Sequence, residues 1–92
     1  FGAFNSTNFE NLLREMDIET LLVTGCVTNY CVETTVRDAA DRGFAVAMVD
    51  EAIAGFSQES HDATLASLRS GFAAIIPTVD DTTAMLNEIR EP

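Results

Sequence analysis

The sequence predicts an α/β fold built on a parallel β-sheet, to which this chain gives about three strands and four helices. Three short apolar runs, typical of strands buried on both faces, lie at residues 20–24, 44–49 and 72–76. They alternate with amphipathic stretches, which indicates parallel strands joined by helical crossovers. Because open sheets usually have about five or six strands, we expect a C-terminal portion of one larger domain.

The first helix is expected to begin after the polar segment 5–7, which offers good N-terminal caps. Thr7 and Glu10 have the spacing of a capping box, in which each side chain bonds the other residue's backbone amide. The apolar residues that follow share one helical face: Phe9, Leu12, Leu13 and Met16. We expect Asp17 to end this helix, so that residues 20–24 form the first strand.

The stretch 21–37 carries the most informative pattern in the chain. Its apolar strand breaks into a turn at residues 25–29, and a helix is expected over residues 31–42 with Gly43 as its stop. The inner face of that helix contains Val32, Thr35, Val36, Ala39 and Ala40. A thiol at a helix N-terminus has its thiolate stabilised by the macrodipole. Cys31 is therefore a candidate nucleophile, with burial as a small apolar residue the equal alternative.

Two further strand–helix units complete the chain. After the strand at 44–49, we interpret Asp50 as a structural hydrogen-bond acceptor, with a role in a pocket as the minority alternative. Residues 52–57 are expected to form a loop, with Ser57 capping the third helix. The apolar positions of that helix are Ala63, Leu65, Ala66 and Leu68, and Gly71 ends it. Pro77 ends the third strand, and Asp80 or Asp81 caps a last helix. That helix is expected to face inward with Met85, Leu86 and Ile89.

Composition excludes several classes of function. A net charge of -10 argues against binding to nucleic acid or to an anionic membrane surface. No apolar run approaches the roughly 20 residues needed to span a bilayer. The 2 cysteines form no disulfide framework, and His61, the single histidine, lacks a partner at the spacing of metal ligands. We expect a cytoplasmic protein that acts on a small molecule, with no cofactor or metal bound by these residues.

Residues 24–32, Thr-Gly-Cys-Val-Thr-Asn-Tyr-Cys-Val, form a specific motif. Together with Thr35, the run 37–39 and Gly43, they resemble the isochorismatase-like cysteine hydrolase family, whose pattern is roughly Thr-Gly-x-x-Thr-Asn-x-Cys-Val. The segments 2–7 and 49–52 look like two other family segments. The resemblance covers nearly the whole chain. It implies a three-layer α-β-α, Rossmann-like domain of which residues 1–92 are the C-terminal portion.

By this resemblance, Cys31 matches the family nucleophile. The resemblance also implies a cis peptide between Cys26 and Val27, and an oxyanion hole made by the backbone N–H groups of Val27 and Cys31. It places Tyr30 and Asn29 on the substrate side of the site. Phe1 and Phe4 fall on a segment that lines the family's pocket, with core packing an equal alternative.

The resemblance further implies catalytic parts outside these residues. The family's Asp base lies on its first strand, and its Lys lies just before the segment that matches Phe1. Neither has a counterpart in this chain, so both are expected in an N-terminal part of the domain. Nicotinamidases carry their metal site in that part. Family members commonly form dimers or tetramers, so we expect a homo-oligomer that also needs the N-terminal part.

The leading functional hypothesis is a cysteine-dependent hydrolase that cleaves a small amide, ureido or carbamoyl C–N bond through a thioester. Isochorismatases, which cleave a vinyl ether, are the alternative within the family, and some of them lack the cysteine. A different class is a redox-active thiol protein, with Cys26 resolving an oxidised Cys31. We expect Cys26 to be buried, which argues against this class. A non-enzymatic scaffold is the third class.

Overall fold

A parallel sheet of three strands forms the centre of the computed structural model, which describes residues 2–4 and 8–90. Strands β1 (Thr20–Cys26), β2 (Ala45–Ala54) and β3 (Ala74–Ile76) lie in the order β1-β2-β3. Both neighbouring pairs are parallel, as expected for strands joined by helical crossovers. The α/β fold predicted from the sequence is therefore confirmed.

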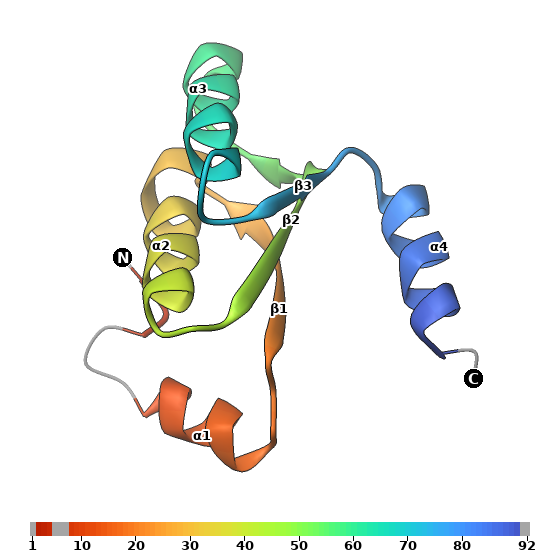
Figure 1. Ribbon diagram of the computed structural model, residues 1–92. Helices are drawn as coiled ribbons and strands as arrows, with labels where there is room; N and C mark the ends of the chain where they lie inside the picture. Colours follow the sequence, from red (N-terminus) through yellow and green to blue (C-terminus); the bar gives the residue numbers. More distant parts are fainter. Residues whose placement is uncertain (1, 5–7, 91–92) are drawn as a thin grey trace.

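The described residues also form four α-helices: α1 (Phe9–Glu15), α2 (Glu33–Asp41), α3 (Gln58–Arg69) and α4 (Val79–Arg90). A π-helical turn, η1 (Thr28–Val32), leads directly into α2. Figure 1 shows α2 and α3 on one side of the sheet and α4 on the other, so the elements form three layers. None of the helices in the described ranges is long and apolar enough to cross a bilayer.

The core lies between the sheet and the layer formed by α2 and α3. Val46 and Met48 of β2 point to the same face, since side chains alternate along a strand, and both are buried. Val36 and Leu68, from the two helices, are fully buried against that face. Gly43 follows α2 with a φ of 90°, a conformation that favours glycine, so it ends the helix as predicted.

The ladder between β1 and β2 is interrupted at the carboxyl end of the sheet. Val23 pairs with Met48, whereas Gly25 pairs with Ile53, so residues 49–52 stand opposite the single residue 24. This irregularity takes Asp50 out of the ladder with β1. The predicted loop over residues 52–57 is wrong in its first part, because β2 pairs with β1 again and extends to Ala54.

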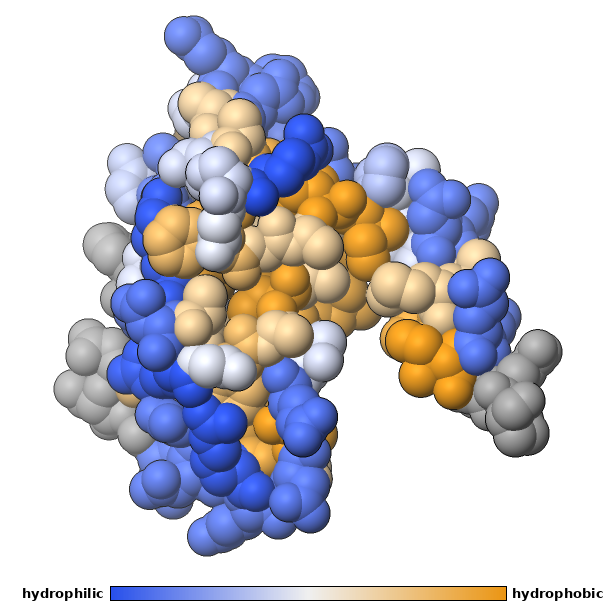
Figure 2. Space-filling view, viewed as in Figure 1, coloured by the Kyte–Doolittle hydropathy of each residue, from blue (hydrophilic) through white to orange (hydrophobic). Residues whose placement is uncertain are grey.

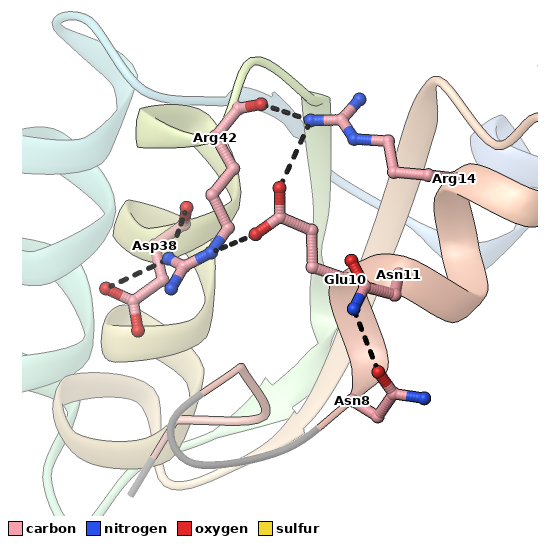
Figure 3. Close-up of polar contacts among 6 residues, drawn as sticks. All are labelled: Asn8, Glu10, Asn11, Arg14, Asp38 and Arg42. Carbon is pink, nitrogen blue, oxygen red and sulfur yellow. Dashed lines mark hydrogen bonds and ion pairs between the residues drawn. The ribbon is translucent and has the colours of Figure 1, made fainter.

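Helix α1 is held against the end of α2 by charged side chains (Figure 3). Arg42 Nε donates to Glu10 Oε1 at 2.9 Å, and Arg42 Nη1 donates to the Asp38 carbonyl oxygen at 3.1 Å. The Glu10 carboxylate also lies 3.7 Å from Arg14, which donates to the carbonyl oxygen of Arg42. These contacts join two helices that are separated in sequence by β1.

Phe4 packs beneath these charges and is only 4% exposed. Its ring centroid lies 5.1 Å from that of Phe9 and 5.9 Å from that of Phe44, and the Arg42 guanidinium carbon lies 4.9 Å away. These contacts are those of a core residue, and contact of Phe4 with substrate stays a prediction. Phe1 and the predicted cap Thr7 lie outside the described residues.

Several apolar side chains expected to be buried are exposed. Strand β1 is an edge of the sheet, so Leu22 is exposed instead of buried on both faces. Helix α1 buries only Leu13, and Leu12 and Met16 are exposed. Figure 2 shows apolar surface on the side of α4 that faces the rest of the molecule. On that helix Leu86 and Ile89 are 44% and 71% exposed, because α4 packs mainly against β2 and β3.

Candidate active site

Cys31 lies in η1, between the carboxyl end of β1 and the start of α2, and is half-buried. The Val27 carbonyl oxygen closes this turn by accepting from the Tyr30 amide at 3.1 Å and the Val32 amide at 3.2 Å. The helix predicted to begin at Cys31 thus begins differently, with a π-helical turn from Thr28 and regular α-helix from residue 33. Cys31 remains in the first turns at the amino end of the helical segment.

The peptide bond between Cys26 and Val27 is cis, as the family resemblance implied. Within the described ranges, the Val27 amide donates to no acceptor in the chain. Val27 and Cys31 line one cavity, and a backbone amide without a partner in the chain can donate to a ligand or to water. The assignment of the Val27 and Cys31 amides to an oxyanion hole stays a prediction.

Cys31 borders two cavities. The first has a volume of about 250 Å³, and Ala3, Cys26 and Thr35 are among the residues that line it. The second, of about 280 Å³, is lined by Val27, Tyr30, Cys31 and Phe56. Its walls are apolar, and the rings of Tyr30 and Phe56 meet edge to face with centroids 6.0 Å apart. The structure therefore brings Tyr30 to the predicted nucleophile and adds Phe56, which the sequence analysis did not single out.

Asn29, the other residue predicted to face substrate, has a buried side-chain oxygen. Among the described residues, Asn29 Oδ1 is the buried side-chain polar atom without a hydrogen-bond partner. Its backbone departs from helical geometry, with φ −95° and ψ 15°. An unpaired buried acceptor costs free energy, so this oxygen needs a donor from a ligand, a water molecule or another part of the protein. Its contact with substrate stays a prediction.

Behind the turn, a chain of hydrogen bonds joins η1, α3 and β2. His61 is buried, with 7% of the residue exposed, and its Nδ1 lies 2.7 Å from Thr28 Oγ1. His61 Nε2 lies 2.6 Å from Asp50 Oδ1. Thr28 is fully buried, whereas the Asp50 side chain is 43% exposed. The interpretation of Asp50 as a structural hydrogen-bond acceptor is consistent with this contact.

The role of His61 was missed, although the sequence contains a signal for it. The buried residues of α3 are His61, Thr64, Leu65 and Leu68, which have the i, i+3, i+4, i+7 spacing of one helical face. The sequence analysis instead assigned Ala63 and Ala66 to the buried face, and both are exposed. Because His61 has the helical spacing of Leu65 and Leu68, the sequence could have predicted that it is buried. A buried histidine needs hydrogen-bond partners for its ring nitrogens.

The two cysteines are both free, and their exposures differ from the expectation. Cys26, expected to be buried, is exposed. The expectation is wrong because β1 is an edge strand and Cys26 is its last residue. Burial of Cys26 therefore gives no argument against a redox reaction with Cys31. In the part of the chain that the structure describes, no group of three or more His, Cys, Asp or Glu side chains is placed to hold a metal ion.

Comparison with known proteins shows which family of proteins this chain resembles. Residues 1–80 match the family model described as Isochorismatase domain. Nicotinamidase 3 from Arabidopsis thaliana is 40% identical over 76 residues, which make up 83% of this chain and 38% of that protein. A ureidoacrylate amidohydrolase from Methylobacterium radiotolerans is 33% identical over 73 residues, covering 78% of this chain and 28% of that protein.

A solved structure supports the same relationship. The crystal structure of an isochorismatase-like hydrolase from Alkaliphilus metalliredigens matches with a TM-score of 0.86 at 30% identity. The match covers 92% of this chain and 46% of that one. The chain thus spans less than half the length of these three relatives.

Proposed function

Because this chain belongs to the isochorismatase family, we propose that the protein is a cysteine-dependent hydrolase of a small amide, ureido or carbamoyl C–N bond. The observation that carries the proposal is the position of Cys31. Its side chain borders two cavities, and the unpaired amide of Val27 lies at the start of the same turn. A nucleophile and an amide donor in one turn form half of an acyl-transfer site.

In the proposed reaction, Cys31 Sγ attacks the carbonyl carbon of the substrate. The amides of Val27 and Cys31 stabilise the oxyanion that develops, a contribution of about 3 kcal/mol for one such donor in known enzymes. The C–N bond then breaks, the amine leaves with a proton, and water hydrolyses the thioester. The family resemblance assigns the proton transfer to an Asp outside these residues.

The substrate class follows from two supporting observations. The two sequence relatives described above are named as a nicotinamidase and a ureidoacrylate amidohydrolase, and both names denote amide C–N hydrolysis. The cavity between Tyr30 and Phe56 is apolar, which suits a flat, weakly polar group beside the scissile amide. We therefore favour an amide that carries an aromatic or unsaturated group over biuret or an N-carbamoyl amino acid.

A substrate panel tests the proposal. Nicotinamide, ureidoacrylate, biuret and an N-carbamoyl amino acid are each incubated with the full-length protein, and release of ammonia is followed. We expect hydrolysis of one of the first two compounds, and we expect Cys31→Ala to abolish it without changing the thermal unfolding midpoint. A protein whose Cys31→Ala variant keeps its turnover contradicts the proposal. Cys26→Ser is the matched control and is expected to keep its activity.

A thiol-redox function is the second candidate, because Cys26 and Cys31 line the same cavity. In this function, peroxide oxidises Cys31 to a sulfenic acid, and Cys26 displaces water from it to form a disulfide. Peptide mapping after mild peroxide treatment distinguishes the candidates. Rapid formation of a disulfide between these cysteines, together with no hydrolysis of the panel, favours the redox function.

A further inference from the structure

We infer that Thr28, His61 and Asp50 are positioning residues whose hydrogen bonds hold the turn η1 so that Cys31 can attack its substrate. The inference rests on the proposed function, because it concerns the reaction of Cys31. The three residues act through the backbone of the turn and not on the substrate. They come from three elements, η1, α3 and β2, which these two hydrogen bonds join.

The two hydrogen bonds of His61 leave its imidazole ring little freedom to rotate. Both ring nitrogens of His61 have a partner at short hydrogen-bond distance, Thr28 Oγ1 at 2.7 Å and Asp50 Oδ1 at 2.6 Å. A rotation of the ring breaks both bonds at once. Because His61 and Thr28 are buried, water does not readily replace the hydrogen bond between them, and an unpaired polar group there is costly.

The chemistry of Asp50 and Thr28 decides which atom donates and which accepts in each of these hydrogen bonds. An ionised carboxylate only accepts hydrogen bonds, so Asp50 selects the tautomer in which His61 Nε2 carries the proton. In the neutral ring Nδ1 is then an acceptor, and the Thr28 hydroxyl must donate to it. The Thr28 side chain is thereby fixed in one rotamer, with its hydrogen directed at His61.

This anchor acts where the backbone of η1 is least regular. Thr28 is the first residue of the turn and Cys31 is its fourth. Between them, the backbone of Asn29 departs from helical geometry. Regular helical geometry therefore does not by itself fix the position of Cys31 relative to Thr28. A side-chain anchor at Thr28 supplies the missing constraint. A displacement of the nucleophile by about 1 Å is enough to slow an enzyme by up to about 100-fold.

Two substitutions of Thr28 test the role in the full-length protein. Thr28→Val keeps the shape of the side chain and removes the hydroxyl, whereas Thr28→Ser keeps the hydroxyl. With the panel compound that the unmodified protein hydrolyses fastest, Thr28→Val should lower kcat by about 10- to 100-fold and leave KM within about twofold. Thr28→Ser should keep most of kcat. An unchanged kcat in Thr28→Val, or equal losses in both variants, would overturn the inference.

Thr82→Val is the matched control for loss of a buried hydroxyl. Thr82 is 6% exposed, and its hydroxyl donates to the Thr78 carbonyl oxygen at the start of α4. We expect Thr82→Val to keep its kcat even where its unfolding midpoint falls as far as that of Thr28→Val. If kcat in the two variants follows the unfolding midpoint alike, the effect of Thr28 is general destabilisation and the inference is wrong.

A second measurement, made on the unmodified protein, does not depend on turnover. Nitrogen-15 NMR of the His61 ring, assigned by comparison with His61→Gln, reports which nitrogen carries the proton. The inference requires a neutral ring protonated at Nε2, with Nδ1 as acceptor. A proton on Nδ1 of the neutral ring would overturn it. Activity that persists in Cys31→Ala contradicts the proposed function instead, so the two failures are distinguishable.

Discussion

Gly55 is a residue whose small size has a clear structural reason. A Cβ atom built at this position would lie 3.0 Å from Thr28 Oγ1 and 3.3 Å from Thr28 Cβ. The chain directly after β2 therefore packs closely against Thr28, the first residue of η1. Any side chain at position 55 must displace either Thr28 or the backbone of residue 55 itself.

Gly55→Ala is expected to destabilise the protein by about 1–3 kcal/mol through overpacking and to lower kcat, because Thr28 is displaced. Gly71→Ala is the matched control, since a Cβ there meets no atom within 4 Å. Thermal unfolding and turnover of the two variants are compared side by side. Equal stability and equal kcat in both variants would show that the approach of β2 to Thr28 has no effect on the site.

At the scale of single residues, the motif at residues 24–32 predicted more of the candidate site than the spacing of apolar residues did. Cys31, Tyr30 and the cis bond at Cys26 were all expected from the resemblance, and the structure brings Cys31 and Tyr30 to one cavity. His61 was missed because its partners are 33 and 11 residues away in sequence. Contacts over such distances depend on how the elements pack, which a local pattern does not contain.

At the scale of elements, α3 supports the site through its N-terminus. Ser57 caps this helix by accepting from the Ser60 amide at 3.1 Å, and the amide of His61 donates to the Ser57 carbonyl oxygen at 3.1 Å. The first turn of α3 thus fixes the backbone that carries the imidazole. This cap was predicted from the sequence and is confirmed.

Ser57→Ala removes this cap and is expected to cost about 1 kcal/mol of unfolding free energy. The control is Ser70→Ala at the other end of α3, where the hydroxyl donates to the Ser67 carbonyl oxygen at 2.8 Å. We expect hydrogen exchange of the first-turn amides to increase in Ser57→Ala and to stay unchanged in Ser70→Ala. Equal exchange in the two variants would mean that the cap does not stabilise this turn.

The elements themselves were largely predictable, and their ends and faces were less so. Three apolar runs identified the strands, because strands buried by helical crossovers read as continuous apolar stretches. The extension of β2 to Ala54 was missed because it depends on renewed pairing with Gly25 and Cys26 after an irregular segment. The second helical segment begins earlier than predicted because η1 is a π-helical turn. A single turn of this kind is too short to be recognised from the spacing of apolar residues.

At the scale of the whole molecule, exposed apolar surface on β1 and α4 agrees with the share of a related protein that the chain covers. Leu22 on the edge strand and Ile89 on α4 are exposed, and the chain covers 46% of a related solved structure. An edge strand and an unpacked helix face are surfaces that further chain commonly covers. The dependence on an N-terminal part that supplies Asp and Lys, and the formation of a homo-oligomer, stay predictions.

The most direct test of the central claim is detection of the acyl-enzyme. The full-length protein is mixed with the panel compound that it hydrolyses fastest, quenched rapidly in acid, digested, and examined by tandem mass spectrometry. We predict that the mass of the acyl group appears on Cys31 and that Cys26 stays unmodified. Active enzyme that carries the acyl group on another residue, or turns over without any acyl group on Cys31, would contradict the account.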